Sequence, residues 1–305
     1  MFVIKIKRFL TDPVIRLSYL SELGLFNHMS DMDYLKRKYQ VIMHKELDLD
    51  NPQTFNEKLQ WLKLYDRKPI YTTMVDKYEV KKYVTSMIGE KYIIPTLGIW
   101  EHFDDVDFDS LPNQFVLKCT HDSGGLVICK DKSNFDKISA KKKIERCLKR
   151  NYYWPGREWP YKNVKPRIIA EKYMEDSIDK KLTDYKFYCF NGEVKFLYVS
   201  TGLDNHSTAQ MSFYDTQFNK MPFRRSDYRE LEHTPKKPCH FAEMIEIAEK
   251  LSEDIPFLRV DLYEIDDQIY FSELTFYPCS GLMVTEPEEW DAILGEWLDL
   301  RDAAL

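Results

Sequence analysis

The first 70 residues show the apolar spacing of helices. Apolar residues recur at three- and four-residue steps over residues 1–70, as on one face of a helix. Asn51-Pro52 interrupts this pattern, and Thr54 precedes Glu57 by three residues, which is the spacing of a capping box. The sequence therefore predicts a helical N-terminal region, with one helix beginning directly after Thr54.

The rest of the chain alternates between helix and strand patterns. We expect further helices over about 74–88, 140–150 and 240–252, and a last one from about 287. Short runs of β-branched and aromatic residues predict strands at 115–118, 126–130, 167–170, 185–190 and 193–199, and a final hairpin over 257–276. Asn191-Gly192 is the strongest two-residue hairpin signal. Hairpins mixed with helices predict an α+β fold.

Composition narrows the class of protein. The chain has 305 residues, of which 44% are hydrophobic and 31% charged, as in an ordinary soluble globular protein. Its net charge of −6 argues against a general nucleic-acid binder, whose footprint is basic. The six cysteines are scattered without zinc or redox spacing, so we expect free thiols in a reducing cytosol. No apolar run approaches the roughly 20 residues that span a bilayer.

The N-terminus is basic but does not read as a signal peptide. Residues 1–10 have only interrupted apolar positions and no small-residue cleavage site. Two alternatives stay open for this segment: an amphipathic helix that touches anionic lipid through Lys5, Lys7 and Arg8, or a plain packing helix. We expect a cytoplasmic protein, and the first alternative would place it at the inner face of the membrane.

The first candidate site is the segment from Lys118 to Gly125. A lysine at a strand end is followed by a short loop that contains Ser123, Gly124 and Gly125. Backbone N–H groups of such a loop can turn inward, and glycine allows a polyphosphate to approach closely. The spacing is neither a Walker A loop nor a Rossmann fingerprint. An ordinary hairpin is the alternative.

The second candidate site is the final hairpin. Side chains alternate faces along a strand, so Arg259 and Asp261 share one face, as do Glu273 and Thr275. If the turn has three residues, 266–268, Asp261 lies opposite Glu273 and Arg259 opposite Thr275. Two facing carboxylates repel each other unless a cation lies between them, and hard oxygen ligands beside phosphate select Mg²⁺.

The register of this hairpin depends on the length of its turn. A three-residue turn pairs Ile265 with Ile269, whereas a two-residue turn, 266–267, would separate the two acids. Val260 and Leu262 mark the opposite face as the buried one. The alternative to a metal site is a solvated face on which two acids meet by chance.

The third candidate site is the strand over 167–170 and the polar residues after it. A strand that runs into a polar hinge can offer its backbone to the edge of an adenine ring. A plain buried strand gives the same pattern.

In their order along the chain, these segments resemble the ATP-grasp superfamily, which includes D-alanine–D-alanine ligase. The resemblance implies two α+β lobes that hold ATP between them, after a helical N-terminal extension. It implies regions at 1–112 (helices and a short α/β segment), 113–166 (the small lobe with a phosphate-covering loop) and 167–305 (the C-terminal lobe with the metal hairpin).

The resemblance also implies roles for individual residues. Those expected to bind ATP are Lys77 and Lys118 at the phosphates, Ser123, Gly124 and Gly125 in the covering loop, Glu171, Lys172, Tyr173 and Met174 at the adenine, and Asp179 at the ribose, with Glu175 and Asp176 as alternatives. Asp261, Glu273 and Thr275 are expected to hold Mg²⁺. Thr275 stands where many relatives have asparagine, so a second metal site is weakened.

Several segments are more narrowly similar to the teichuronopeptide-biosynthesis (TupA-like) ATP-grasp proteins of bacterial surface-polysaccharide loci. They are 51–61, 184–187 with 191–193, and 259–263, and the whole resemblance covers roughly residues 50–285. It implies an ATP- and Mg²⁺-dependent ligase that joins an amino acid or amine to a uronic acid of a capsule, teichuronic acid or O-antigen.

The implied reaction passes through an acyl phosphate. Arg259 would stabilise charge that develops on the transferred phosphoryl group. His121 and Lys186 are candidates for contact with phosphate or carboxylate, and for both a structural role is the alternative.

Two other functions remain open. A glycosyltransferase would also suit a polysaccharide setting, and the Asp-x-Asp segments at 105–107 and 48–50 fit its metal pattern, although both read as loop acids. A non-catalytic nucleotide-binding partner is the other alternative. The loss of an acid at Asp261 or Glu273 would favour it, and both acids are present.

Overall fold

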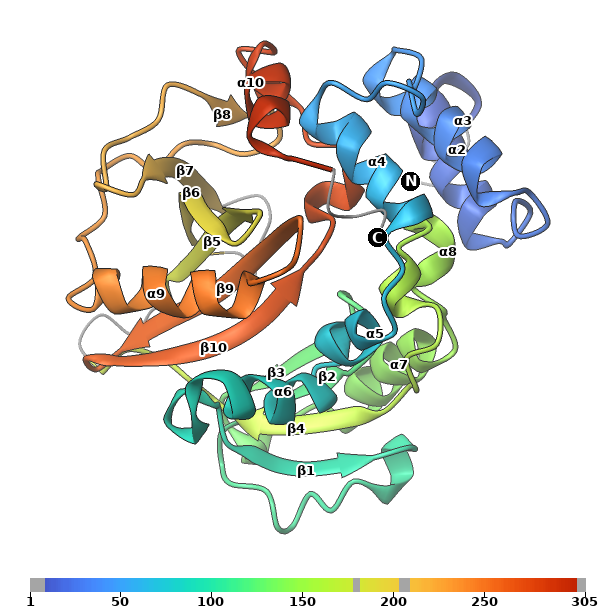
Figure 1. Ribbon diagram of the computed structural model, residues 1–305. Coiled ribbons are helices and arrows are strands. Elements are labelled where there is room, and N and C mark those ends of the chain that lie inside the picture. Colours follow the sequence, from blue (N-terminus) through green and yellow to red (C-terminus); the bar gives the residue numbers. More distant parts are fainter. Residues whose placement is uncertain (1–8, 178–181, 203–208, 301–305) are drawn as a thin grey trace.

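A computed structural model describes residues 9–177, 182–202 and 209–300 of the chain (Figure 1). Asp179 and the basic residues Lys5, Lys7 and Arg8 lie outside the described residues. Within the described ranges, no helix combines the length and the apolar character needed to cross a membrane. The cysteines are free thiols, as expected.

The N-terminal region is helical, as the sequence predicts. It comprises α2 (Pro13–Glu22), α3 (Asp31–Met43) and α4 (Phe55–Tyr65). The capping box is present: the Thr54 side chain accepts a hydrogen bond from the Glu57 N–H, and the Glu57 carboxylate accepts one from the Thr54 N–H.

The single helix expected over 74–88 is instead two helices, α5 (Ile70–Val75) and α6 (Glu79–Ile88). Asp76 interrupts the helix between them because its backbone is extended, with φ −74° and ψ 115°. Its carboxylate then accepts hydrogen bonds from the N–H groups of Tyr78 and Glu79 at the start of α6. Gly89 ends α6, as expected, with a φ of 104°.

The smaller sheet has four antiparallel strands in the order β1-β4-β2-β3. They are β1 (Thr96–Trp100), β2 (Phe115–Cys119), β3 (Leu126–Cys129) and β4 (Ile168–Lys172). The helix α7 (Lys137–Leu148) packs on one face around Leu117 and Ile144. The sequence patterns did not predict β1 as a strand. The strands of this sheet come from all three of the regions expected from the resemblance.

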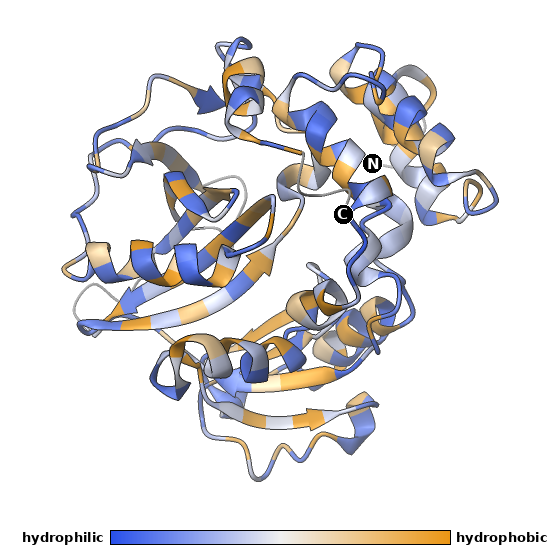
Figure 2. Cartoon of the chain, in the orientation of Figure 1, coloured by the Kyte–Doolittle hydropathy of each residue, from blue (hydrophilic) through white to orange (hydrophobic). Residues whose placement is uncertain are grey.

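The larger sheet has five antiparallel strands in the order β10-β9-β5-β6-β7. They are β5 (Asp184–Phe190), β6 (Glu193–Thr201), β7 (Gln210–Asp215), β9 (Phe257–Ile265) and β10 (Gln268–Thr275). Asn191 and Gly192 both have positive φ, at 49° and 81°, as their hairpin turn requires. The apolar face of α9 (Phe241–Ser252) covers one side of the sheet, and Figure 2 shows apolar and polar residues alternating along this helix.

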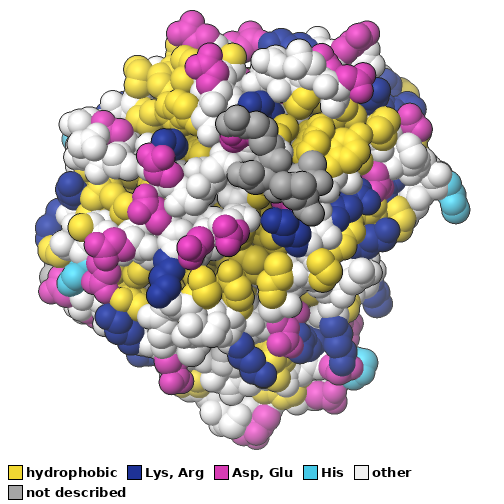
Figure 3. Space-filling model, in the orientation of Figure 1, with side chains coloured by type: hydrophobic (Ala, Val, Ile, Leu, Met, Phe, Trp, Pro, Cys, Tyr) yellow, Lys and Arg dark blue, Asp and Glu magenta, His cyan; other side chains and the backbone are white. Residues whose placement is uncertain are grey.

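Shorter elements complete the chain. α8 (Tyr153–Gly156) lies in the connector between the sheets, α10 (Trp290–Trp297) packs against α4, and β8 (Arg224–Arg225) pairs with β11 (Thr285–Glu286). Short 3-10 helices span Glu90–Tyr92, Phe103–Asp105, Lys132–Asn134, Trp159–Tyr161 and Pro278–Ser280. Charges of both signs are interspersed over the face in Figure 3, without a large basic region.

Candidate active site

The final hairpin brings together the residues that the sequence singled out, but its turn length and register differ from those expected. Its turn has two residues, Asp266 and Asp267, both at positive φ, so Ile265 pairs with Gln268 and the expected pairing of Ile265 with Ile269 is wrong. A β-bulge between Phe271 and Glu273 then shifts the register by one residue. Asp261 therefore still lies opposite Glu273, and Arg259 lies opposite Thr275, as predicted.

Arg259 is the centre of this cluster. Its Nε and Nη2 donate to the two carboxylate oxygens of Asp261, each at 2.7 Å. The same Nη2 donates to Glu273 Oε1 at 3.0 Å and to Thr275 Oγ1 at 2.9 Å. The cation between the two acids in this structure is therefore the Arg259 guanidinium, which is almost completely buried.

Lys186 reaches the same carboxylate from the neighbouring strand β5. Its Nζ lies 2.6 Å from Asp261 Oδ2 and 3.0 Å from Asp184 Oδ1. Burial opposes the charge on Lys186, but Asp184 and Asp261 outweigh it and hold its pKa well above the usual range. Asp261 is completely buried and balances two cations.

Glu273 is the acid that solvent and ligands can reach, because 36% of its side chain is exposed. Burial of the rest opposes its ionisation, but Lys77, Lys186 and Arg259 lower its pKa to about 2. Lys77 lies in the turn just before α6, and its Nζ donates to the Asp122 carbonyl at 2.6 Å. The cluster thus brings the expected residue Lys77 close to the hairpin acids.

These residues fit a magnesium ion that takes most of its ligands from phosphate. Glu273 supplies an accessible carboxylate, and Thr275 a hydroxyl, both of them hard oxygen donors. Asp261 can join them only if Arg259 shifts, because both of its oxygens already accept hydrogen bonds from cations. Across the described parts of the chain, no three His, Cys, Asp or Glu side chains form a metal-binding group of their own.

Lys118 lies on the four-stranded sheet, where a buried carboxylate holds it. Its Nζ is 2.6 Å from one oxygen of Glu171, and Lys81 of α6 pairs with the other oxygen. Burial would raise the pKa of Glu171, but Lys118 and Lys81 lower it. The Glu171 side chain, expected at an adenine ring, is therefore engaged with two lysines.

The loop after Lys118 is buried in its first half and exposed at its tip, and its role as a phosphate cover stays a prediction. Thr120, His121 and Asp122 are buried, and Ser123 and Gly124 are exposed at the tip. Ser123 Oγ lies 3.2 Å from the Tyr152 hydroxyl.

Gly125 is required by packing, and its contact with a phosphate stays a prediction. A Cβ added there would come within 2.5 Å of Cys119 Sγ. Its N–H donates to Asp122 Oδ1 at 2.9 Å, which closes the loop.

His121 is buried against the end of α7. Its Nε2 lies 3.1 Å from the carbonyl oxygens of both Cys147 and Arg150, at the end of α7. The imidazole is buried, with 2% of the residue exposed, so we leave His121 out of the proposed catalytic groups.

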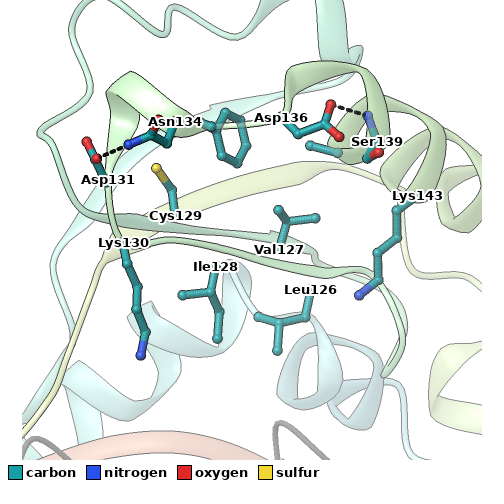
Figure 4. A pocket seen from close by; sticks show the side chains of 12 residues that line it. Leu126, Val127, Ile128, Cys129, Lys130, Asp131, Asn134, Asp136, Ser139 and Lys143 are labelled. Atoms are coloured by element: carbon teal, nitrogen blue, oxygen red, sulfur yellow. Dashed lines mark hydrogen bonds between the residues drawn. The ribbon is translucent and has the colours of Figure 1, made fainter.

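One face of the four-stranded sheet offers apolar surface beside Lys118. Leu126 and Ile128 of β3 are 38% and 40% exposed, and they point with Lys130 to the side opposite Val127 and Cys129 (Figure 4). Because Leu126 pairs with Lys118, these side chains share the lysine's face of the sheet. An exposed apolar surface next to a cation suits a purine base.

The expected adenine hinge follows this strand. Lys172 is exposed, and its backbone N–H donates to the Pro95 carbonyl. The Tyr173 hydroxyl donates to Glu175 at 3.0 Å, and Met174 is half-buried. Their contact with an adenine ring stays a prediction.

Sequence reasoning missed Lys81, Asp184 and Asp76 at this site. Lys81 follows Lys77 by four residues, and both lie around the start of α6: Lys77 in the turn before the helix and Lys81 near its first residue. Asp184 is two residues from Lys186 on one strand, which also gives a shared face. The pairing of Asp76 with Arg167, at 2.8 Å, joins distant segments and has no local signal.

Solved structures similar to this chain include several ligases, each distant in sequence. D-Alanine–D-alanine ligase from Bacillus anthracis, complexed with ATP, is 14% identical, with a TM-score of 0.37 over 67% of this chain and 55% of its own. The Helicobacter pylori enzyme is 14% identical, with a TM-score of 0.39 over 80% and 69%. The ATP-grasp ligase PsnB, complexed with Mg and ADP, is 9% identical, with a TM-score of 0.41 over 92% and 70%. This chain thus spans little more than half the length of the B. anthracis ligase.

The comparison with curated protein sequences returned no match. The TupA-like ATP-grasp family matches residues 57–299, which is most of the chain. This match confirms the fold and the resemblance expected from the sequence. The chain belongs to the TupA-like ATP-grasp family.

Proposed function

We propose that this protein is an ATP-dependent ligase that joins a carboxylate to an amine. The observation that carries the proposal is the cluster around Arg259, in which an accessible Glu273 accepts a hydrogen bond from the guanidinium. Lys77, from another part of the fold, helps to lower the pKa of this carboxyl. Lys118 and the exposed Leu126 and Ile128 supply a second cation and an apolar surface for the nucleotide. Phosphoryl transfer needs such positioning and charge neutralisation more than a protein nucleophile.

The reaction proceeds in two steps. A carboxylate oxygen of the substrate attacks the γ-phosphorus of ATP, the bond from that phosphorus to the β–γ bridging oxygen breaks, and ADP leaves. The amine nitrogen then attacks the carbonyl carbon of the acyl phosphate, phosphate leaves, and the amine's proton passes to water. Arg259 and Lys77 stabilise the negative charge that develops on the transferred group, and Lys186 fixes Arg259 by sharing Asp261 with it.

Glu273, Thr275 and, after a shift of Arg259, Asp261 would hold Mg²⁺, which neutralises phosphate charge when bound. The substrates that we propose are a uronic acid of a bacterial surface polysaccharide and an amino acid or amine. The TupA-like family match over residues 57–299 supports this choice.

We expect ATP with Mg²⁺ to raise the melting temperature by about 5 °C or more at saturation, because a ligand that binds only the native state stabilises it by mass action. A thermal-shift titration with ATP, GTP and UDP-sugars measures this. Stabilisation by a UDP-sugar and not by ATP would favour the glycosyltransferase instead.

Hydroxylamine provides the test of carboxylate activation. With ATP, Mg²⁺ and hydroxylamine, an acyl phosphate yields a hydroxamate, and we expect its formation to require an added uronic acid. Hydroxamate that depends on an amino acid instead would keep the ligase but reverse the assignment of the activated substrate. Stabilisation by ATP without any hydroxamate over a panel of carboxylic acids would favour the non-catalytic nucleotide-binding partner.

A further inference from the structure

The helix α4 carries a stripe of buried polar residues that the proposed reaction does not use. Asn56, Gln60 and Lys63 are spaced by four and three residues, so they share one face of the helix, and each is at most 1% exposed. Buried polar groups are costly unless they are hydrogen-bonded. The hydrogen-bond partners of these three side chains therefore indicate the role of the stripe.

All three residues bind the backbone just after β10. Gln60 Nε2 donates to the carbonyls of Ser280 and Gly281, at 3.1 and 2.6 Å. Lys63 Nζ donates to the Ser280 carbonyl at 2.7 Å and to its hydroxyl at 3.1 Å. Asn56 exchanges two hydrogen bonds with the Met283 backbone, both 2.8 Å long.

The segment held in this way is strained. Cys279, Ser280 and Gly281 have φ values of 52°, 56° and 63°, so three successive residues are left-handed and two of them are not glycine. A Cβ added at Gly281 would come within 2.5 Å of Gln60 Nε2. Strained backbone persists only where its surroundings hold it, and it gathers at functional sites.

This turn adjoins the site on the side of Arg259. It begins three residues after Thr275, whose hydroxyl accepts from Arg259. The expected ATP lysines belong to other segments: Lys77 to the turn before α6, and Lys118 to β2.

We propose that Asn56, Gln60 and Lys63 are positioning residues that hold the turn Pro278–Gly281 as the wall of the pocket for the carboxylate and amine substrates. This rests on the proposed function. The proposal also gives a role to the segment 51–61, one of the segments that resemble the TupA-like proteins. This segment contains Asn56 and Gln60, two residues of the stripe. α4 thereby ties the N-terminal helices to the site.

The helix supplies its own matched control. Lys58 is also on α4, but its Nζ donates to the carbonyls of Gly295 and Leu298, at 2.8 and 2.7 Å, and not to the turn. Lys63→Met and Lys58→Met therefore make the same chemical change on one helix, and only the first removes contacts with the turn.

The test compares hydrogen exchange and kinetics of the full-length variants. In Lys63→Met, exchange at the amides of Ser280, Gly281 and Leu282 should become at least tenfold faster, because the contacts that fix the turn are lost. Lys58→Met should leave these amides unchanged. Unchanged exchange at the turn in Lys63→Met would overturn the proposal, whether or not the protein proves to be a ligase.

The kinetic arm separates positioning from a general loss of structure. The KM of the carboxylate substrate in the hydroxamate reaction should rise about tenfold in Lys63→Met, with ATP affinity within about twofold of the parent. A purely structural defect would lower kcat with the folded fraction and leave KM unchanged, which would count against the proposal. If Lys63→Met does not fold, Gln60→Met is the deciding variant. It removes two hydrogen bonds to the turn and one from Lys63, but no charge.

Discussion

Glu273→Gln should lower the rate of ATP-dependent turnover about a hundredfold or more. The substitution preserves the shape of the side chain but removes the accessible carboxylate, the one with a pKa of about 2 and therefore ionised at any working pH. Charge stabilisation by a metal ion is worth several kcal/mol at the transition state, and each ~1.4 kcal/mol corresponds to a tenfold change in rate. ATP affinity should change much less, because Lys77, Lys118 and the apolar surface of β3 remain.

The measurements are hydroxamate formation and calorimetric ATP affinity. Glu246→Gln is the matched control, since Glu246 is exposed on α9 of the same part of the fold, and both quantities should keep their parent values. Glu264 lies on the face opposite Asp261 but is less suitable, because its carboxylate accepts hydrogen bonds from the N–H groups of Cys239 and His240. Near-normal turnover in Glu273→Gln would exclude this carboxylate from the chemistry.

The hairpin shows what the sequence can specify about this site. The alternation of polar and apolar residues along β9 was sufficient to place Arg259 and Asp261 on the face opposite Val260 and Leu262. The turn was expected to be one residue too long, and the bulge at Ser272 was not foreseen. The two differences cancel, so the predicted pairs are correct for a reason that the pattern did not contain.

Contacts between distant segments were beyond the reach of sequence patterns. Nothing local distinguishes Glu171 as a partner of two lysines from Glu171 as an adenine hinge, because its neighbours read as a strand in both cases. His121 was a candidate catalytic group by residue type, yet its ring nitrogen Nε2 lies at hydrogen-bond distance from two backbone carbonyls at the end of α7. Lys63 and Gln60 look like ordinary polar positions of a surface helix until the turn at Ser280 is packed against them.

Asp261→Asn should have the largest effect on stability, a loss of roughly 3–5 kcal/mol in the free energy of unfolding. The completely buried carboxylate accepts hydrogen bonds from Arg259 and Lys186. An amide of the same shape leaves Glu273 as the remaining counter-charge of Arg259 and Asp184 as that of Lys186. Breaking a buried pair by removing one partner is costly for this reason.

Urea unfolding measures the loss, and an unchanged m-value shows that the unfolding reaction is the same. Asp227→Asn is the matched control: its carboxylate also binds an arginine, Arg225, but is 50% exposed, so its loss should cost less than about 1 kcal/mol. If the charge of Lys186 is what makes the change costly, Asp261→Asn should cost less in a Lys186→Met background than in the parent. Equal and small losses for Asp261→Asn and Asp227→Asn would mean that Asp261 carries no charge in the native protein, and the charged cluster around Arg259 would then need a different account.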